Sequence, residues 1–196
     1  GAYLLAKDDH LPYSTISTDF KSASERKVLD AAEVHLMLAE ASLRGWCTPL
    51  SAQAHYEAGV TQSFAYWGAG GVTTYLANNT GTPFDYDDVV ETGDVNDFTS
   101  RITATVAWNE AGTNEEKLEK IITQKWIAAY TNSIEAWVDH RRTGYPKLPY
   151  NYKNDSNSDF GVIAADDFMK RMVFPVPEKT NNPSGYSDAV SKLGGA

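Results

Sequence analysis

The sequence predicts an all-α fold in which helical hairpins are joined by long irregular loops. Three segments, at 30–44, 51–68 and 113–144, repeat apolar residues at the spacing of a helix. A glycine ends each segment, as is common at the C-terminus of a helix. The stretches 69–112 and 145–165 are polar and rich in turn-forming residues, which predicts loops of unusual length.

The segment 113–144 is predicted to form two helices with almost no loop between them. Thr113 and Glu116 fit a capping box at the start of the first helix, and Asn132 and Glu135 fit another at the start of the second. We expect the two helices to form a corner or an antiparallel hairpin.

The segments 30–44 and 51–68 together have the length of one tetratricopeptide unit. The spacing of Ala52, Tyr56 and Gly59 matches the second helix of such a unit. One unit cannot bury its own apolar face, because repeats of this kind are stabilised by their neighbours. We therefore expect the later helix pair, and helices outside this chain, to pack against it.

The rest of the chain gives weaker signals. Short helices are expected at 72–78, 98–107 and 165–170. Residues 172–177 are expected to be extended, because two prolines oppose a helix there. The tail that follows is expected to be a surface strap.

Length and charge narrow the classes of function. The 196 residues fit one domain, and 17 Lys and Arg against 26 Asp and Glu give a net charge of −9. Such a chain repels phosphate backbones, so we expect no nucleic-acid partner. No apolar run approaches the ~20 residues of a membrane-spanning helix. Cys47 is the only cysteine, and the residues before it do not resemble a lipoprotein cleavage site.

Four stretches of sequence carry a family resemblance. They are ITQKW at 122–126, EAWVDHRRTGYPKL at 135–148, RMVFPVPEKTNNPSGY at 171–186 and LAEASLRGW at 38–46. Together they resemble the C-terminal half of SusD/RagB-like outer-membrane lipoproteins. The resemblance implies a mostly helical fold with tetratricopeptide-like hairpins (SusD-like). It also implies that residues 1–196 are a single domain, the C-terminal part of a larger protein.

The resemblance further implies non-enzymatic capture of a glycan or another nutrient. In the family, the protein lies at the outer membrane, on the cell surface of Bacteroidetes-type bacteria, and delivers its ligand to a TonB-dependent SusC-like transporter. Contact with the membrane would be made only through a lipid anchor that this chain lacks. Two alternatives remain: a docking module that contacts the transporter without binding ligand, and a glycoside hydrolase.

The loop at 69–112 is the predicted ligand-binding region. Sugars present apolar C–H faces and hydroxyl groups, which flat aromatic rings and amide or carboxylate side chains can meet. The candidate residues are Tyr75, Asn78, Asn79, Tyr86, Asp94 and Trp108. We expect Tyr75 or Trp108 to stack on the ligand.

No catalytic or metal site is predicted. The four histidines show no paired metal-binding spacing, and no G-x-S-x-G nucleophile motif is present. The acids between Asp85 and Asp97 offer oxygen ligands of the kind that calcium takes, but they complete no EF-hand pattern. We therefore expect no cofactor and no enzymatic activity.

Two arginines follow the aromatic part of the last predicted helix. Arg141 and Arg142 are adjacent, so their side chains point about 100° apart on a helix. We expect one of them to pair with Glu33 or Glu40, two acids on a helix that looks buried. The other should cap the helix end or stay near the surface.

Overall fold

A computed structural model describes residues 27–46, 49–88, 97–150, 156, 162–169 and 173–193. These residues form two compact units, and each is described by itself. The main unit holds the described residues of Leu11–Asp87 and Asp97–Pro149. The tail unit holds the described residues of the remaining ranges. Within the ranges just given there are helices but no strand, so the predicted all-α class is confirmed.

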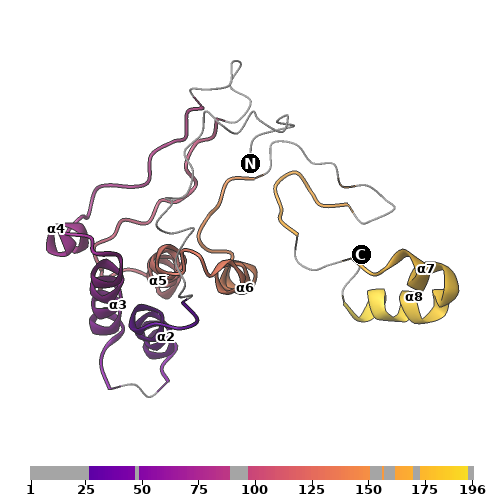
Figure 1. Cartoon of the computed structure of the whole chain (residues 1–196), viewed down its shortest axis with the longest axis horizontal. Coiled ribbons are helices and arrows are strands. Elements are labelled where there is room, and N and C mark those ends of the chain that lie inside the picture. Colours follow the sequence, from indigo (N-terminus) through magenta and orange to yellow (C-terminus); the bar gives the residue numbers. More distant parts are fainter. Residues whose placement is uncertain are drawn as a thin grey trace. The chain divides into compact units, whose positions relative to one another are not determined.

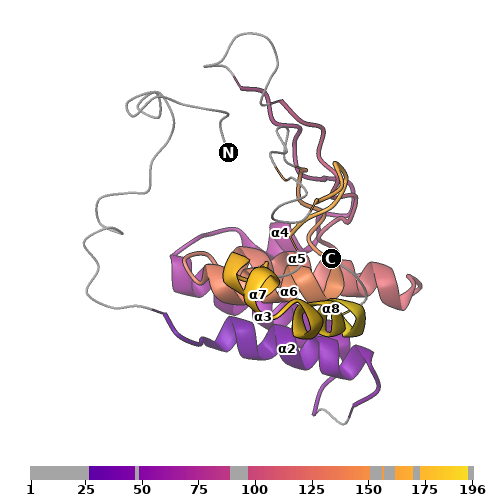
Figure 2. The same ribbon diagram turned by 90° about the vertical axis from the view of Figure 1, so that its right-hand side faces the viewer.

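The main unit begins with the predicted hairpin, formed by α2 (Ala31–Leu43) and α3 (Ala52–Trp67). Asp30 caps α2, because its side chain accepts a hydrogen bond from the Glu33 backbone N–H at 2.8 Å. Ser51 caps α3 in the same way, and Gly68 ends α3 in the left-handed conformation. The two helices lie against each other along their length (Figures 1 and 2).

The core of the main unit lies where α2 and α3 meet α5 (Asn114–Ala128). Gly59 allows the close approach of α2 and α3: a Cβ added there would lie 2.7 Å from Leu36 Cγ. The Tyr56 hydroxyl is buried and donates to the Val106 carbonyl at 2.7 Å. The buried apolar residues are Ala32, Leu36, Ala39, Tyr56, Val60, Ile121, Ile122, Ala128 and Tyr145.

The second helix pair consists of α5 and α6 (Ser133–Thr143), with four residues between them. The capping box of Thr113 and Glu116 is confirmed. The second predicted box is wrong, since the Asn132 side chain makes no capping hydrogen bond. Gly144 ends α6 with φ of 75°, the left-handed conformation that glycine adopts without strain.

A buried lysine joins the two helices of this pair to α2. Lys125 Nζ on α5 lies 2.8 Å from an Asp139 carboxylate oxygen on α6 and 3.8 Å from Glu33 on α2. The side chains of Lys125, Glu33 and Asp139 are only 5%, 8% and 6% exposed. Burial raises the pKa of Glu33 above its usual value, and the positive charge of Lys125 only partly offsets this. The three charges therefore depend on one another.

The predicted pairing of one arginine with a helix acid is confirmed. Arg142 donates to both carboxylate oxygens of Glu40 at 2.6 Å, and it also contacts Asp139. Burial alone would raise the pKa of Glu40, but hydrogen bonds from Arg142 and Arg44 lower it overall. Arg141 points elsewhere, and its guanidinium lies 4.6 Å from the centre of the Trp137 ring. In the run RRTG at 141–144, Arg142 thus forms the ion pair that joins α6 to α2.

The residues just before α2 are also bound to α5. Lys27 pairs with Asp30 at 2.8 Å and donates to the backbone carbonyl of Ala128, at the C-terminus of α5. Its ammonium group also lies over the rings of Tyr66 and Trp67, at 5.0 and 5.6 Å from their centres. A cation at this helix end is favoured by the helix dipole.

The loops and the tail differ in part from the prediction. The helix expected at 72–78 is present as α4 (Val72–Leu76). The helix expected at 98–107 is absent: Phe98 instead pairs with Tyr86 in an isolated antiparallel bridge. Near 165–170, the described part has a turn rather than a helix.

The tail unit contains two helices that were not predicted, α7 (Val176–Asn181) and α8 (Pro183–Lys192). Each begins with a proline in its first turn, where the missing N–H has no partner to lose. Residues 176 and 177 are therefore helical, not extended. Neither helix has a buried residue, so the tail is helical but lies at the surface of its unit. The Phe174 and Tyr186 rings pack edge to face at 5.5 Å between centres.

A pair of histidines lies between α2 and α3. His35 Nδ1 and His55 Nδ1 are 3.2 Å apart, and His55 is fully buried. His55 Nε2 is buried without a hydrogen-bond partner among the described residues. Burial, and then the neighbouring His35, lower the pKa of His55.

This lowered pKa predicts loss of stability in mild acid. The unfolded state binds a proton near pH 6.5, whereas the folded state resists protonation of His55 until a lower pH. The free energy of unfolding should therefore be at its full value above about pH 7 and fall towards about pH 5. Urea unfolding of the protein and of His55→Leu at several pH values checks this. In His55→Leu, the free energy of unfolding should fall less between pH 7 and pH 5 than in the unaltered protein. An equal fall in both proteins would contradict the assignment to His55.

Candidate functional site

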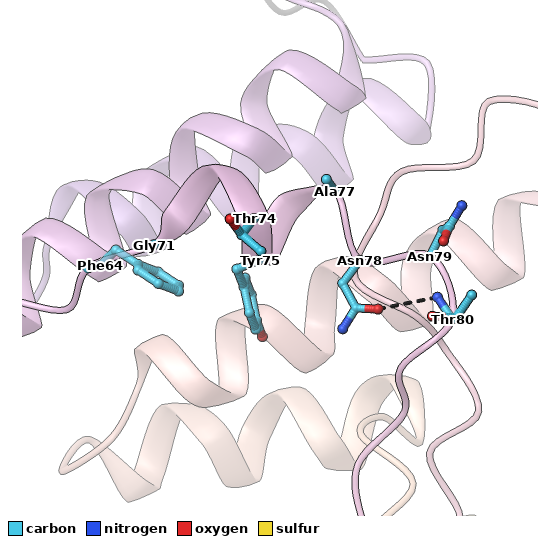
Figure 3. Close-up of a pocket in the computed structure, with 9 residues that line it drawn as sticks. Phe64, Gly71, Thr74, Tyr75, Ala77, Asn78, Asn79 and Thr80 are labelled. Carbon is cyan, nitrogen blue, oxygen red and sulfur yellow. Dashed lines mark hydrogen bonds between the residues drawn. The ribbon is translucent and has the colours of Figure 1, made fainter.

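The candidate site is an open hollow at the C-terminal end of α3, beside the short helix α4. Its volume is about 910 Å³. Figure 3 shows Phe64 and Tyr75 toward one end, with Thr74 beside Tyr75. Asn78, Asn79 and Thr80 lie toward the other end. It is lined by Phe64, Gly70, Gly71, Thr74, Tyr75, Ala77, Asn78, Asn79 and Thr80.

A glycine-rich turn positions the aromatic side of the hollow. Gly71 precedes α4 with φ of 82°, a conformation that side-chain-bearing residues rarely adopt. The turn brings Tyr75 of α4 against Phe64 of α3, with 5.0 Å between ring centres and 48° between ring planes. The Tyr75 hydroxyl is held by Gln124 of α5, whose amide nitrogen lies 2.9 Å away. Both rings are thus fixed before any ligand arrives.

The polar side of the hollow is a turn built on Asn78. Its side-chain oxygen accepts hydrogen bonds from the backbone N–H groups of Thr80 at 3.2 Å and Gly81 at 2.7 Å. Its backbone carbonyl accepts from Ala107 N–H at 2.8 Å, which ties the turn to the far end of the loop. Among the described residues, the bonds of this side chain use only its oxygen, so the NH₂ group remains as a donor. Asn79 is exposed beside it.

The predicted ligand residues are only partly brought together. Tyr75, Asn78 and Asn79 line the hollow. Tyr86 does not: its ring stacks on Phe98 at the antiparallel bridge, with 5.3 Å between centres. Trp108 does not either, since it packs on the core residue Tyr56 and its Nε1 donates to Glu110 at 2.7 Å. Asp94 lies outside the described residues.

Some residues of the hollow were missed by sequence reasoning. Phe64 looks like an ordinary core residue of a helix, and Thr74 and Thr80 look like ordinary polar surface residues. The signal that could have found them is the run from Gly68 to Gly71, since three glycines in four residues bring two aromatic helices close together.

The described residues offer no group of three or more His, Cys, Asp or Glu placed to hold a metal ion. Asp85, one of the acids considered for calcium, instead accepts a hydrogen bond from the Ser100 backbone N–H at 2.7 Å. In the same part of the chain, no helix has the length and apolar character needed to cross a membrane.

The helical hairpin, the second helix pair and the long loop between them define a tetratricopeptide-like all-α protein. The model of one family, the SusD and RagB outer membrane lipoproteins, matches residues 5–196. The chain belongs to this family, as its four sequence stretches predicted, and membership places the protein at the outer membrane on the cell surface. Among proteins with curated descriptions, none matches.

Solved structures of SusD homologues agree with this assignment. A homologue from Bacteroides vulgatus is 42% identical with a TM-score of 0.80, and the match covers 95% of this chain and 37% of that one. A chitin-binding homologue from Flavobacterium johnsoniae is 44% identical with a TM-score of 0.73, covering 86% of this chain and 34% of that one. A homologue from Bacteroides uniformis is 40% identical with a TM-score of 0.73, with the same coverage of both chains. This chain therefore spans about a third of the length of these relatives.

Proposed function

We propose that this protein captures a glycan without chemical turnover and delivers it to a TonB-dependent SusC-like transporter. The observation that carries the proposal is the hollow at α4. It offers two fixed aromatic rings beside amide and hydroxyl groups, the combination that suits the C–H faces and hydroxyl groups of a sugar. Membership of the SusD and RagB family supports it.

The first ligand to test is a chitin oligosaccharide, since the Flavobacterium johnsoniae homologue is a chitin-binding protein. Calorimetric titration should give saturable binding, and chromatography of the recovered sugar should show no shortened product. Release of shorter sugars would favour the glycoside hydrolase instead.

The hollow predicts which substitutions weaken binding. Tyr75→Ala and Asn79→Ala should weaken the affinity, Tyr75→Ala by about 1–3 kcal/mol, the usual scale for an aromatic residue at the centre of a contact. Asn79 is exposed, so Asn79→Ala should leave the unfolding midpoint unchanged. Tyr75 also packs against the core, so Tyr75→Ala could weaken binding by disturbing the fold. The affinity of Tyr75→Phe is therefore measured as well, because this variant keeps the ring and loses only the bond to Gln124.

Tyr86→Ala is the matched control, because Tyr86 is an exposed aromatic residue of the same loop that does not line the hollow. Its affinity should equal that of the unaltered protein. If Tyr86→Ala abolishes binding while Tyr75→Ala and Asn79→Ala do not, the ligand binds at the bridge and the hollow is not the site.

One observation favours the docking alternative. The second helix pair and the turn between its helices expose several large apolar side chains, residues of a kind that contact sites between proteins use. They are Trp126 at 41%, Ile127 at 44%, Tyr130 at 50%, Ile134 at 72%, Trp137 at 39% and Val138 at 40% exposed. A docking module would bind a partner protein through these side chains. Calorimetric titration with any sugar would then show no binding.

A further inference from the structure

We infer that the hollow at α4 selects uncharged saccharides and that the protein does not take polyanionic glycans such as uronates or sulfated sugars. The inference rests on the proposed capture of a glycan and adds the chemical class of that glycan. It is argued from the lining of the hollow, from the cations near it and from the charge of the whole chain.

The lining residues carry no charged side chain. They are two aromatic residues, two threonines, two asparagines, one alanine and two glycines. Rings and amides satisfy the C–H faces, hydroxyl groups and acetamido groups of neutral sugars. A carboxylate or sulfate that left water here would find no cation to compensate it, and an uncompensated charge is costly to desolvate.

The cations of the adjacent helix are already engaged. The α5 residue that hydrogen-bonds Tyr75 is Gln124, whose side chain is a neutral amide and not a cation. The lysines on either side of it point to other partners: Lys120 donates to the Thr105 carbonyl and hydroxyl, and Lys125 pairs with Asp139. Recruiting either lysine to an anionic ligand would break a contact that is mostly buried.

The net charge of this chain acts in the same direction. A net charge of −9 and a sequence pI of about 4.8 give a negative surface at neutral pH. Long-range repulsion lowers the rate at which a polyanion reaches such a surface, and salt screens this effect. Neutral polysaccharides experience neither penalty.

Gly70 offers a position at which this selectivity can be altered. It lines the hollow, and a Cβ added there meets no atom within 4 Å. Its φ lies outside the left-handed range, so a side chain is accepted without backbone strain. Gly70→Lys adds one cation, and Gly70→Gln is a neutral control of similar length.

The experiment measures affinity by calorimetry for two panels of ligands, in low and in physiological salt. One panel is neutral: chitin oligosaccharides, amylose, xylan and galactomannan. The other is acidic: polygalacturonate, alginate and chondroitin sulfate. The unaltered protein should bind at least one neutral ligand and none of the acidic ones. Gly70→Lys should bind at least one acidic ligand in low salt, where Gly70→Gln binds none.

The outcomes separate the two proposals. Binding of an acidic glycan by the unaltered protein overturns the selectivity while the capture of glycans survives. Equal affinities of Gly70→Lys and Gly70→Gln for every acidic ligand also overturn it, because the hollow would then not set the charge preference. If no ligand of either panel binds, the capture of glycans fails, and the selectivity fails with it.

Discussion

Replacing Lys125 by methionine is expected to lower the free energy of unfolding by about 3–5 kcal/mol, a large share of the stability of one domain. Lys125 is the shared cation of two buried carboxylates, Glu33 on α2 and Asp139 on α6. Methionine fills a similar volume but leaves Glu33 without the cation of α5 and leaves Asp139 with Arg142 alone. Urea unfolding at pH 7 gives the value.

Two further variants test the cause of this loss. Arg141→Met removes a charge on the neighbouring helix that pairs with the Trp137 ring, so it should cost under about 1 kcal/mol. Adding Glu33→Gln to Lys125→Met removes one of the stranded charges and should recover part of the lost stability. If the double variant is no more stable than Lys125→Met, the loss comes from packing rather than from buried charge.

Shortening Leu36 to alanine is expected to cost about 2–5 kcal/mol, the range for a fully buried leucine. Leu36 is fully buried on α2, facing Gly59 of α3, in the part of the core where the hairpin meets α5. The loss should be seen as a lower urea midpoint and a lower melting temperature.

The contact between Leu36 and Gly59 gives this prediction a sharper form. Gly59→Ala alone should destabilise by about 1–3 kcal/mol, since the new Cβ would lie 2.7 Å from Leu36 Cγ. In the double variant the added methyl group enters space vacated by Leu36, so the two losses should not add. Strict additivity would show that the helices adjust their spacing and that the close approach is not fixed by this pair.

The helices of the main unit were predictable because their signals are local. Apolar periodicity, the Ser51 cap, the capping box at Thr113 and the glycine stops each act within a few residues, and each is present in the structure. The pairing of an arginine with an acid of α2 was also predictable, because two charges on buried faces require partners.

The errors have physical reasons as well. A proline looks like a helix breaker from sequence alone, yet the prolines of α7 and α8 lie in the first turn, where they favour the helix. The stretch 98–107 has a helix-like spacing of apolar residues, but Phe98 pairs with Tyr86 instead. Tertiary contacts decided that segment, and periodicity does not report them.

The sequence predicted which loop carries the candidate site, but not which residues of that loop line it. Composition pointed to the loop at 69–112, and Tyr75, Asn78 and Asn79 of that loop line the hollow. Composition could not separate the aromatic residue on the hollow from Trp108, which packs on the core residue Tyr56. That distinction depends on which way each ring turns, and only the packing of α4 against α3 fixes it.

The long-range polar contacts of the main unit affect how the ligand specificity of such a protein can change. Lys27 reaches Ala128 across 101 positions, and Arg142 reaches Glu40 across 102. The loop that carries the hollow connects α3 to α5, two helices that both pack against α2. The entropy of closing a loop rises only with the logarithm of its length, so residues can be inserted there at small cost. The helical frame can stay the same while the loop acquires a different ligand.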